Sequence, residues 1–322
     1  MSFSYKMARI ATLAGLAAVF LCSNAIAADP IRVKVASTNK EVFDNLPLYV
    51  ALHAGMFKKE NLAVEITHFA GGGEVVRAIA SGSMDIGMVA TTAAIIAVGR
   101  GESLRMISAY SAPAYGILFV VQTDSPIKTV KDLVGKKAGI SRPGSVSHTG
   151  LNAALQAHGI QGQVEAVPVG GSGDGWAVLK SGRIQATHHT APDVYSLIDR
   201  GEARILFQLS EFLKNYQQGA LVALDGYLGK NGETTRKFLR AVAEAAKFID
   251  QNPAEATRIG AKGMGTPEPA MRATIDAMPA GFFRIGVPES KNFEASMAEA
   301  LGSGALKTAP AYDKVVDRRF LP

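Results

Sequence analysis

The chain has 322 residues, a formal net charge of +6 and a single cysteine, Cys22. Its basic residues are scattered along the sequence, which excludes the clustered basic stripe of a nucleic-acid-binding protein. A mature chain that has lost Cys22 has no cysteine at all, and this excludes disulfides, cysteine nucleophiles and thiolate metal sites.

The first 27 residues have the pattern of a secretory signal peptide. Lys6 and Arg9 precede the apolar run Ile10–Cys22, and an Ala-Ile-Ala cleavage motif ends at Ala27. The run has 13 residues, fewer than the about 20 that span a bilayer. We expect cleavage after Ala27, which leaves 295 residues with a charge of +4 in the periplasm. Lipidation at Cys22 is the alternative, although the bulky Leu21 before it disfavours such processing.

Residues 64–102 and 164–202 resemble each other at a constant offset of 100 residues. Each copy reads as a strand, a glycine-rich turn, a helix ended by Ser-Gly, a second strand and a second helix. The similarity extends upstream, because strand-like segments at 32–36 and 137–141 are each followed by a loop and a helix. Identical positions are Val64/Val164, Glu65/Glu165, Gly71/Gly171, Gly73/Gly173, Ser81/Ser181, Gly82/Gly182 and the closing Arg-Gly-Glu.

This alternation predicts an α/β protein with two similar Rossmann-like lobes and mainly parallel sheets, built from 31–107 and 136–207. Because ligands bind beyond the carboxyl ends of parallel strands, lobes that face each other form a cleft. We expect residues 28–112 to begin lobe I, 113–215 to form lobe II, and 216–322 to return to lobe I with C-terminal helices.

Four segments, in this order, resemble a known family: NLPLYVALHAGMFKKENLAVEI, AIASGSMDIGMVA, DSPIKTVKDLVGKKAGISRPGSVSH and LKSGRIQAT. The family is the solute-binding proteins of ABC importers for sulfonates, nitrate, taurine and thiamine-precursor pyrimidines. The resemblance covers nearly all of the mature chain. It implies a monomer with the type II periplasmic-binding fold, which closes over one small molecule and delivers it to a permease and its ATPase in the inner membrane. The residues before Pro192 depart from the family pattern.

Residues 139–152, GISRPGSVSHTGLN, form the loop before a predicted helix of the second unit. A helix N-terminus favours a carboxylate, sulfonate or phosphate group, and we expect Ser145, Ser147 or His148 to contact such a ligand. A helix start capped by its own serine hydroxyls is the alternative. A nucleotide phosphate loop is disfavoured, since no lysine follows the glycines.

Two further turns follow strands at the expected cleft. Gly72 and Gly73 let a ligand approach backbone amides, or they make a tight turn and nothing more. Thr91 and Thr92 open the next helix, where either hydroxyl caps the helix or reaches the cleft.

His188 and His189 occupy the strand end in the second copy. Adjacent strand residues point to opposite faces, so the pair is unsuited to one metal ion. We expect His189 or His188 to act as a neutral hydrogen-bonding partner, with no metal and no cofactor.

Apolar residues complete the expected site. The resemblance implies that the loop containing Leu46 and Pro47 touches the ligand. Phe43, Tyr115 and Trp176 are candidate stacking walls for an aromatic or heterocyclic acid, although core or hinge positions are the alternative for Trp176.

These features predict a carrier for a sulfonate, carboxylate or pyrimidine-like solute. An enzyme on the same fold, either a pyrimidine synthase or a dehydratase, is one alternative. It is disfavoured because the cysteine-rich motif of the synthases and any Ser-His-Asp or HExxH pattern are missing from the sequence. A ligand-sensing accessory protein is the other alternative, and it would share the same cleft.

Overall fold

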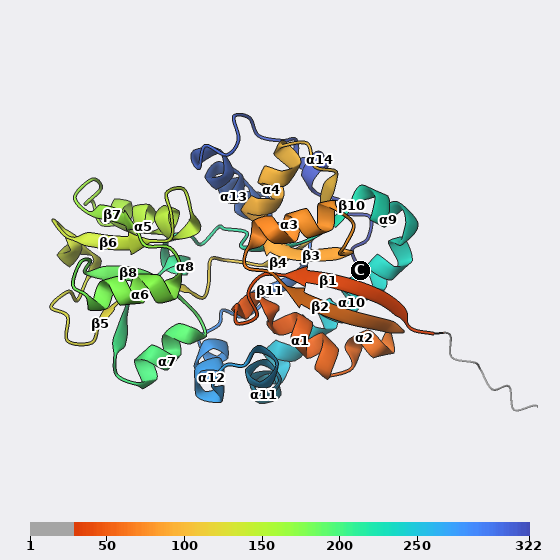
Figure 1. Cartoon of the computed structure of the whole chain (residues 1–322), viewed down its shortest axis with the longest axis horizontal. Helices are drawn as coiled ribbons and strands as arrows, with labels where there is room; N and C mark the ends of the chain where they lie inside the picture. Colours follow the sequence, from red (N-terminus) through yellow and green to blue (C-terminus); the bar gives the residue numbers. More distant parts are fainter. Residues whose placement is uncertain (1–28) are drawn as a thin grey trace, which may run out of the picture.

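Eleven strands form two separate sheets in the computed structural model, which describes residues 29–322. The expected signal peptide, with its cleavage site at Ala27 and the alternative lipid site at Cys22, lies outside the described residues. Lobe I contains a six-stranded sheet in the order β11-β4-β10-β3-β1-β2, and lobe II a five-stranded sheet in the order β7-β6-β8-β5-β9. The two lobes lie side by side along the long axis of the molecule (Figure 1).

The strand bounds follow the predicted alternation. Lobe I contains β1 (Ile31–Ser37), β2 (Leu62–His68), β3 (Ile86–Ala90), β4 (Leu104–Ser111), β10 (Gly219–Leu224) and β11 (Phe283–Gly286). Lobe II contains β5 (Ile117–Gln122), β6 (Lys137–Ile140), β7 (Glu165–Pro168), β8 (Ala186–Thr190) and β9 (Ala203–Gln208).

Both sheets are mainly parallel, as predicted. β1 pairs in parallel with β2 and β3, and β6 pairs in parallel with β7 and β8. The exceptions are β5, β10 and β11. β10 and β5 occupy equivalent places in the two sheets. Each is the first strand after the chain crosses from the other lobe, and each lies antiparallel between two neighbouring strands.

The helices of the two repeat copies keep the offset of 100 residues. α3 (Gly72–Ala80) corresponds to α6 (Ser172–Lys180), and α4 (Thr91–Gly99) corresponds to α7 (Asp193–Asp199), which ends at the same offset but begins two residues later. The helices that precede them are α1 (Leu46–His53) and α2 (Met56–Lys59) in lobe I and α5 (Val146–Ala157) in lobe II. Two short 3-10 turns, η1 (Phe43–Asn45) and η2 (Val130–Leu133), precede α1 and β6.

The remaining helices follow β9 in the chain; α8 packs on lobe II and the others on lobe I, and α12 also contacts α7 of lobe II. They are α8 (Leu209–Phe212), α9 (Asp225–Lys230), α10 (Gly232–Gln251), α11 (Pro253–Met264), α12 (Glu268–Asp276), α13 (Ser290–Gly302) and α14 (Tyr312–Val315). None of the helices in residues 29–322 combines the length and the apolar character needed to cross a membrane.

Each sheet is covered by helices on both faces, so each lobe has its own core. In lobe I, Phe57 of α2 stacks on Phe238 of α10, and both rings are fully buried. On the opposite face, Val75 and Ile79 of α3 are completely buried beside Ile95 of α4. Fully burying such a side chain contributes about 1.5–3 kcal/mol, which explains why these positions follow helical spacing.

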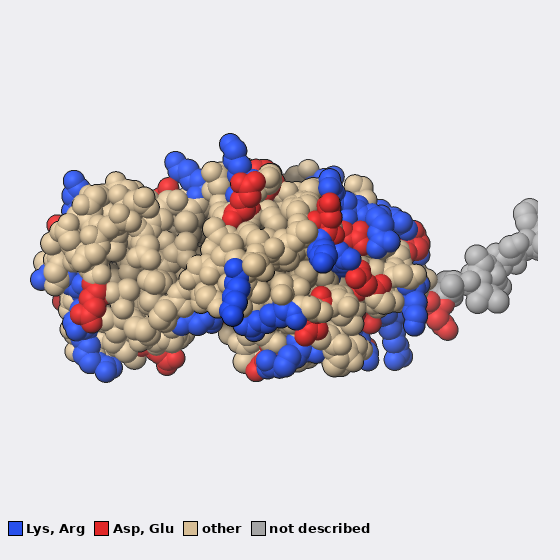
Figure 2. All heavy atoms as spheres, turned by 90° about the horizontal axis from the view of Figure 1, so that it is seen from above, with Lys and Arg blue, Asp and Glu red and all other residues tan. Residues whose placement is uncertain are grey.

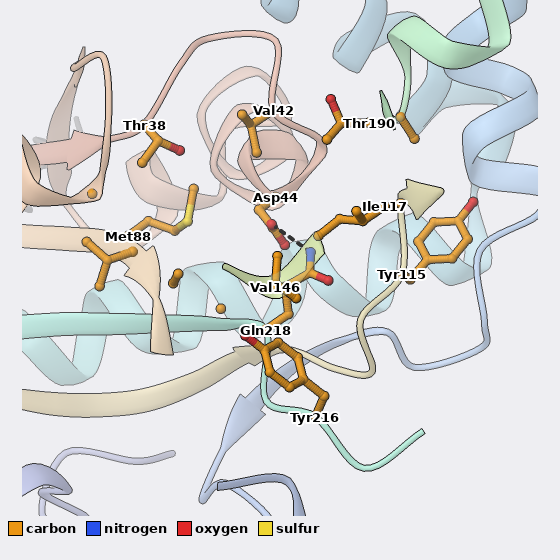
Figure 3. A pocket seen from close by; sticks show the side chains of 16 residues that line it. Thr38, Val42, Asp44, Met88, Tyr115, Ile117, Val146, Thr190, Tyr216 and Gln218 are labelled. Carbon is orange, nitrogen blue, oxygen red and sulfur yellow. Dashed lines mark hydrogen bonds between the residues drawn. The ribbon is translucent and has the colours of Figure 1, made fainter. Parts of the chain in front are cut away.

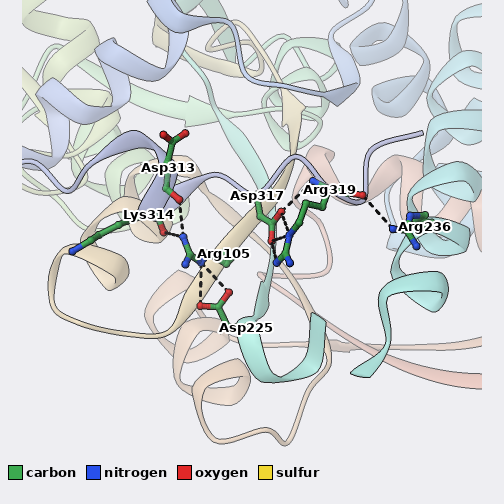
Figure 4. A network of polar contacts seen from close by, with 7 residues as sticks. All are labelled: Arg105, Asp225, Arg236, Asp313, Lys314, Asp317 and Arg319. Carbon is green, nitrogen blue, oxygen red and sulfur yellow. Dashed lines mark hydrogen bonds and ion pairs between the residues drawn. The ribbon is translucent and has the colours of Figure 1, made fainter. Parts of the chain in front are cut away.

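The C-terminal segment is tied to lobe I by a polar network (Figure 4). Arg105 on β4 donates from Nε to the Asp225 carboxylate at 2.9 and 3.1 Å, and from Nη1 to the backbone oxygens of Asp313 and Lys314 at 2.7 Å each. Val316 forms an isolated parallel bridge with Met106. These contacts fix the path of the chain after α13.

Two segments connect the lobes, 112–116 and 209–218. The Tyr115 hydroxyl in the first segment donates a 2.6 Å hydrogen bond to the backbone oxygen of Thr274 in α12. All five strands of lobe II fall inside 113–215, the range that we propose as that lobe. Any movement of one lobe against the other must bend these two segments.

Candidate functional site

A cavity of about 220 Å³ lies between the lobes, beyond the carboxyl ends of β1, β3 and β8 (Figure 3). We call it the central cavity. It is smaller than the roughly 300–1,000 Å³ of pockets for drug-sized ligands, so it suits a small solute. Its lining is Thr38, Val42, Asp44, Gly72, Met88, Val89 and Ala90 from lobe I, Ile117, Val146, Thr190 and Ala191 from lobe II, and Tyr115, Gly116, Tyr216, Gln218 and Gly219 at the connections and the start of β10.

Helix N-termini from both lobes border the central cavity. α3 begins at Gly72 and α5 at Val146, and both of these residues line it. The first N–H groups of a helix have no acceptor within the helix, and among the described residues no acceptor is found for the N–H of Gly72 or Val146. Such groups, together with the helix dipole, attract anions.

Positive electrostatic potential in the cavity comes from these backbone groups. Among the described residues that line it, none is lysine, arginine or histidine. The start of α4 contributes less, because the Thr91 N–H already donates a 2.9 Å bond to the Gln218 backbone oxygen. The lining therefore offers an anion backbone N–H groups and no basic side chain.

The glycine-rich turn before α3 keeps that helix start accessible. Its N-cap, Gly71, has no side chain that competes for the free N–H groups. A Cβ atom placed on Gly72 would meet only the Ala93 Cβ, at 3.5 Å. The helix is held from its other face by Val75 and Ile79 in the core, so the turn itself remains free to face the ligand.

Asp44 gives the cavity an acidic group. It lies in η1 directly before α1, and its Oδ2 accepts a 2.9 Å hydrogen bond from Gln218 Nε2. Its Oδ1 is buried and has no hydrogen-bond partner in the described part of the chain. Burial raises the pKa of Asp44, and polar contacts with Ser111 and Gln218 partly offset this.

Several other buried polar atoms around Asp44 also lack partners among the described residues: Thr91 Oγ1, Tyr110 hydroxyl, Ser111 Oγ and Gln218 Oε1. Buried polar atoms in proteins normally have a partner, either protein or ordered water. Of these four residues only Gln218 lines the central cavity, so the atoms mark a buried polar region around Asp44 and Gln218.

A second cavity of about 410 Å³ adjoins the first and shares Val42, Thr190 and Ala191 with it. It is bordered by Ser172 at the start of α6, the repeat counterpart of Gly72. Glu41 also lines it, together with Asp193 of lobe II. The two repeat copies thus place corresponding helix starts along one interlobe cleft.

The loop 139–152 satisfies its own polar groups. Ser145 is the N-cap of α5 and accepts a 3.4 Å bond from the His148 N–H. Ser147 Oγ accepts from the Ser141 N–H at 2.9 Å, and His148 Nδ1 accepts from the Gly144 N–H at 3.0 Å. His148 lines a separate groove of about 540 Å³ between α5 and α13. The loop therefore contributes Val146 and the helix start to the central cavity, while its three predicted contact residues have local partners.

Thr92 and His189 also have partners away from the central cavity, whereas the buried Thr91 hydroxyl has no partner in the described part of the chain. Thr91 is fully buried, and Thr92 Oγ1 donates a 2.8 Å bond to Glu299 Oε2. His189 Nδ1 accepts from the Thr190 N–H at 3.0 Å, while its Nε2 lies 3.5 Å from the Asp193 carboxylate. Burial lowers the pKa of His189, which favours the neutral ring.

The expected apolar contacts divide between cavity and core. Tyr115 lines the central cavity. Leu46 and Pro47 lie buried in α1, and Phe43 packs edge-on against Tyr115 at 6.0 Å between ring centroids. Trp176 lies in the core of lobe II beside Leu118 and Leu179. These side chains are buried because α1 and α6 present their apolar faces to the sheets.

Of the predicted contact residues, the structure brings Gly72 and Tyr115 together at the central cavity, and Gly73 directly follows Gly72 without lining it. A ligand role for any of the predicted residues stays a prediction. Sequence reasoning missed Asp44, Val146, Thr190 and Gln218. Asp44 and Val146 are immediate neighbours of predicted residues. Gln218 lies in a connecting segment, where no sequence motif indicates a ligand contact.

Comparison with known proteins identifies the family and the fold of the chain. The NMT1/THI5-like family model matches residues 42–256. A protein of Escherichia coli (strain K12) named for aliphatic sulfonate binding is 26% identical over 211 residues. The match covers 66% of this chain and 65% of that relative's length.

Two solved structures share the fold. The periplasmic aliphatic sulphonate binding protein SsuA from Escherichia coli has a TM-score of 0.77 at 21% identity, covering 90% of this chain and 92% of that one. A cysteine-to-serine mutant of DSZB in complex with biphenyl-2-sulfinic acid has a TM-score of 0.73 at 16% identity, covering 90% and 97%. The fold is therefore that of periplasmic binding proteins.

Proposed function

The chain belongs to the NMT1/THI5-like family, and from this membership we propose that it is the solute-binding component of an ABC importer. Its ligand is a small organic anion with one charged group, a sulfonate or a related acid, captured between the lobes. The observation that carries the proposal is the pair of helix N-termini, at Gly72 and Val146, which border one small cavity from opposite lobes.

Capture proceeds by closure of the lobes about the two connecting segments. A ligand that touches both lobes stabilises the closed state over the open one, because only the closed state provides both sets of contacts. The closed protein, acting as a monomer in the periplasm, then delivers the ligand to a membrane permease driven by its ATPase. The relatives named for sulfonate binding support this assignment.

Binding is favoured over catalysis by the chemistry of the lining. A hydrolytic or transfer reaction needs an activated nucleophile beside a base, and the described lining offers Asp44 and hydroxyl groups without a histidine, lysine or cysteine. A sensing role would use the same cleft, and it differs only in the membrane partner.

A thermal-shift screen of the purified mature protein tests the proposal. The screen compares alkanesulfonates, aromatic sulfonates, carboxylates, nitrate and pyrimidines, each at millimolar concentration. We expect at least one organic anion to raise the melting temperature, since a ligand at 100 times its Kd stabilises by about 2.7 kcal/mol. No shift with any anion would contradict the proposal, and turnover of the best ligand would show an enzyme instead.

A further inference from the structure

The position of Asp44 places a carboxyl group in the same small cavity as the proposed anion. Asp44 and Gln218 lie together at the cavity wall (Figure 3). An ionised Asp44 would repel an anionic ligand across a cavity of only about 220 Å³. A protonated Asp44 would instead present an O–H donor to it.

The groups packed around Asp44 do not neutralise it. From β4, Tyr110 and Ser111 face it with hydroxyl groups, and from the second connecting segment Gln218 donates one hydrogen bond. On its own loop, Lys40 and Glu41 are exposed and of opposite charge. No cationic side chain lines the cavity among the described residues.

The two carboxyl oxygens of Asp44 have different surroundings. Oδ2 already accepts a hydrogen bond from Gln218. Oδ1 is buried without a partner in the described part of the chain, and an unpaired buried oxygen is costly. Protonation of Asp44 would remove its negative charge. Burial favours the protonated form, because it raises the pKa of Asp44.

We propose that Asp44 binds the ligand in its protonated form and donates a hydrogen bond to an anionic oxygen, so that capture of one anion takes up one proton. The carboxyl O–H bond stays intact, and the proton comes from solvent when Asp44 is ionised beforehand. This inference rests on the proposed function, because it requires an anionic ligand in the central cavity. It makes Asp44 a determinant of ligand charge.

Isothermal titration with butane-1-sulfonate between pH 4 and pH 9 tests this inference, since the charge of that probe is constant over the range. Binding raises the pKa of Asp44 above its value in the free protein. Affinity is therefore greatest below the free-protein pKa and falls by up to about tenfold per pH unit as pH rises toward the bound-state pKa. Titrations in two buffers of different protonation enthalpy should show uptake of up to one proton per ligand.

Matched variants locate the effect. Asp44→Asn should bind with an affinity that changes less than twofold with pH and should take up no proton. Asp199→Asn, which removes an exposed acid at the end of α7, should retain the wild-type pH profile. The wild-type pH profile needs no variant, so the inference stays testable even if Asp44→Asn folds poorly.

Three outcomes would overturn the inference. Butane-1-sulfonate binding that is independent of pH in the wild-type protein excludes proton uptake. A preference for taurine over ethanesulfonate that strengthens as pH rises, and is lost in Asp44→Asn, would show an ionised Asp44 paired with an ammonium group. If no organic anion binds at any pH, the proposed function itself fails, and the inference fails with it.

Discussion

Thr92 and Glu299 are 207 residues apart in the sequence, yet Thr92 Oγ1 donates a 2.8 Å hydrogen bond to Glu299 Oε2. The Tyr216 hydroxyl donates to the same oxygen. Glu299 therefore joins α4, α13 and the second connecting segment beside the groove between α5 and α13. A buried carboxyl group at such a junction makes stability depend on pH.

Glu299→Gln should change that dependence. Burial raises the pKa of Glu299, and bonds from Tyr216 and Thr92 with the nearby Arg142 partly offset this. A raised pKa means that the contribution of Glu299 to stability is complete below the ordinary value of 4.5 and is lost as pH rises through the pKa of the folded state. Glutamine can accept the same bonds without titrating, so the stability of the variant relative to wild type should increase from pH 4 to pH 8.

Urea unfolding at a series of pH values measures this difference. Glu294→Gln, on the exposed side of the same helix, is the control and should show no such trend. A stability difference between Glu299→Gln and wild type that stays constant with pH would contradict the assigned pKa direction.

Ser147→Ala should affect stability more than binding. Ser147 is 1% exposed, and its Oγ accepts the Ser141 N–H, so its removal leaves a buried donor unpaired at a cost of about 1–3 kcal/mol. Ser145→Ala removes the N-cap and should cost about 1 kcal/mol. Chemical denaturation gives both values. A tenfold loss of ligand affinity with unchanged stability would instead make Ser147 a direct ligand contact.

Arg105→Ala should destabilise the protein by about 2 kcal/mol, because it removes charge-assisted bonds to Asp225 and to the C-terminal segment. Arg105→Lys should recover part of this, since lysine lacks the planar fork. Arg318→Ala breaks an exposed 3.6 Å ion pair with Asp313 and should cost less than about 1 kcal/mol. Equal losses from Arg105→Ala and Arg318→Ala would show that the network does not anchor the segment.

The fold could be predicted because the repeat encodes it locally. Helix and strand periodicity, with Ser-Gly at helix ends, places α3 and α6, and β3 and β8, at the same offset in the structure as in the sequence. The antiparallel positions of β10 and β5 could not be predicted in this way, because they depend on where the chain returns after crossing between lobes.

The candidate site was less predictable than the fold. Gly72 could be identified because glycine in the turn after a strand leaves backbone amides open to a ligand. Ser145, Ser147 and His148 carry the same polar atoms whether they bind a ligand or one another, and only three-dimensional geometry distinguishes the two. Asp44 and Gln218 meet across 174 residues, and no local pattern reports such a contact.

The central claim is that an anion is held at the start of α3, facing lobe II. The most direct measurement is titration calorimetry of Gly72→Asp against Gly73→Asp, using the best organic anion from the thermal-shift screen. Both variants add one negative charge to the first turn of α3, where acids are tolerated or stabilising by about 0.3–1 kcal/mol, but only Gly72 lines the cavity. We predict that Gly72→Asp loses at least about tenfold in affinity, or about 1.4 kcal/mol, while Gly73→Asp loses clearly less and both variants unfold as wild type does. Undiminished affinity in a folded Gly72→Asp would contradict the claim.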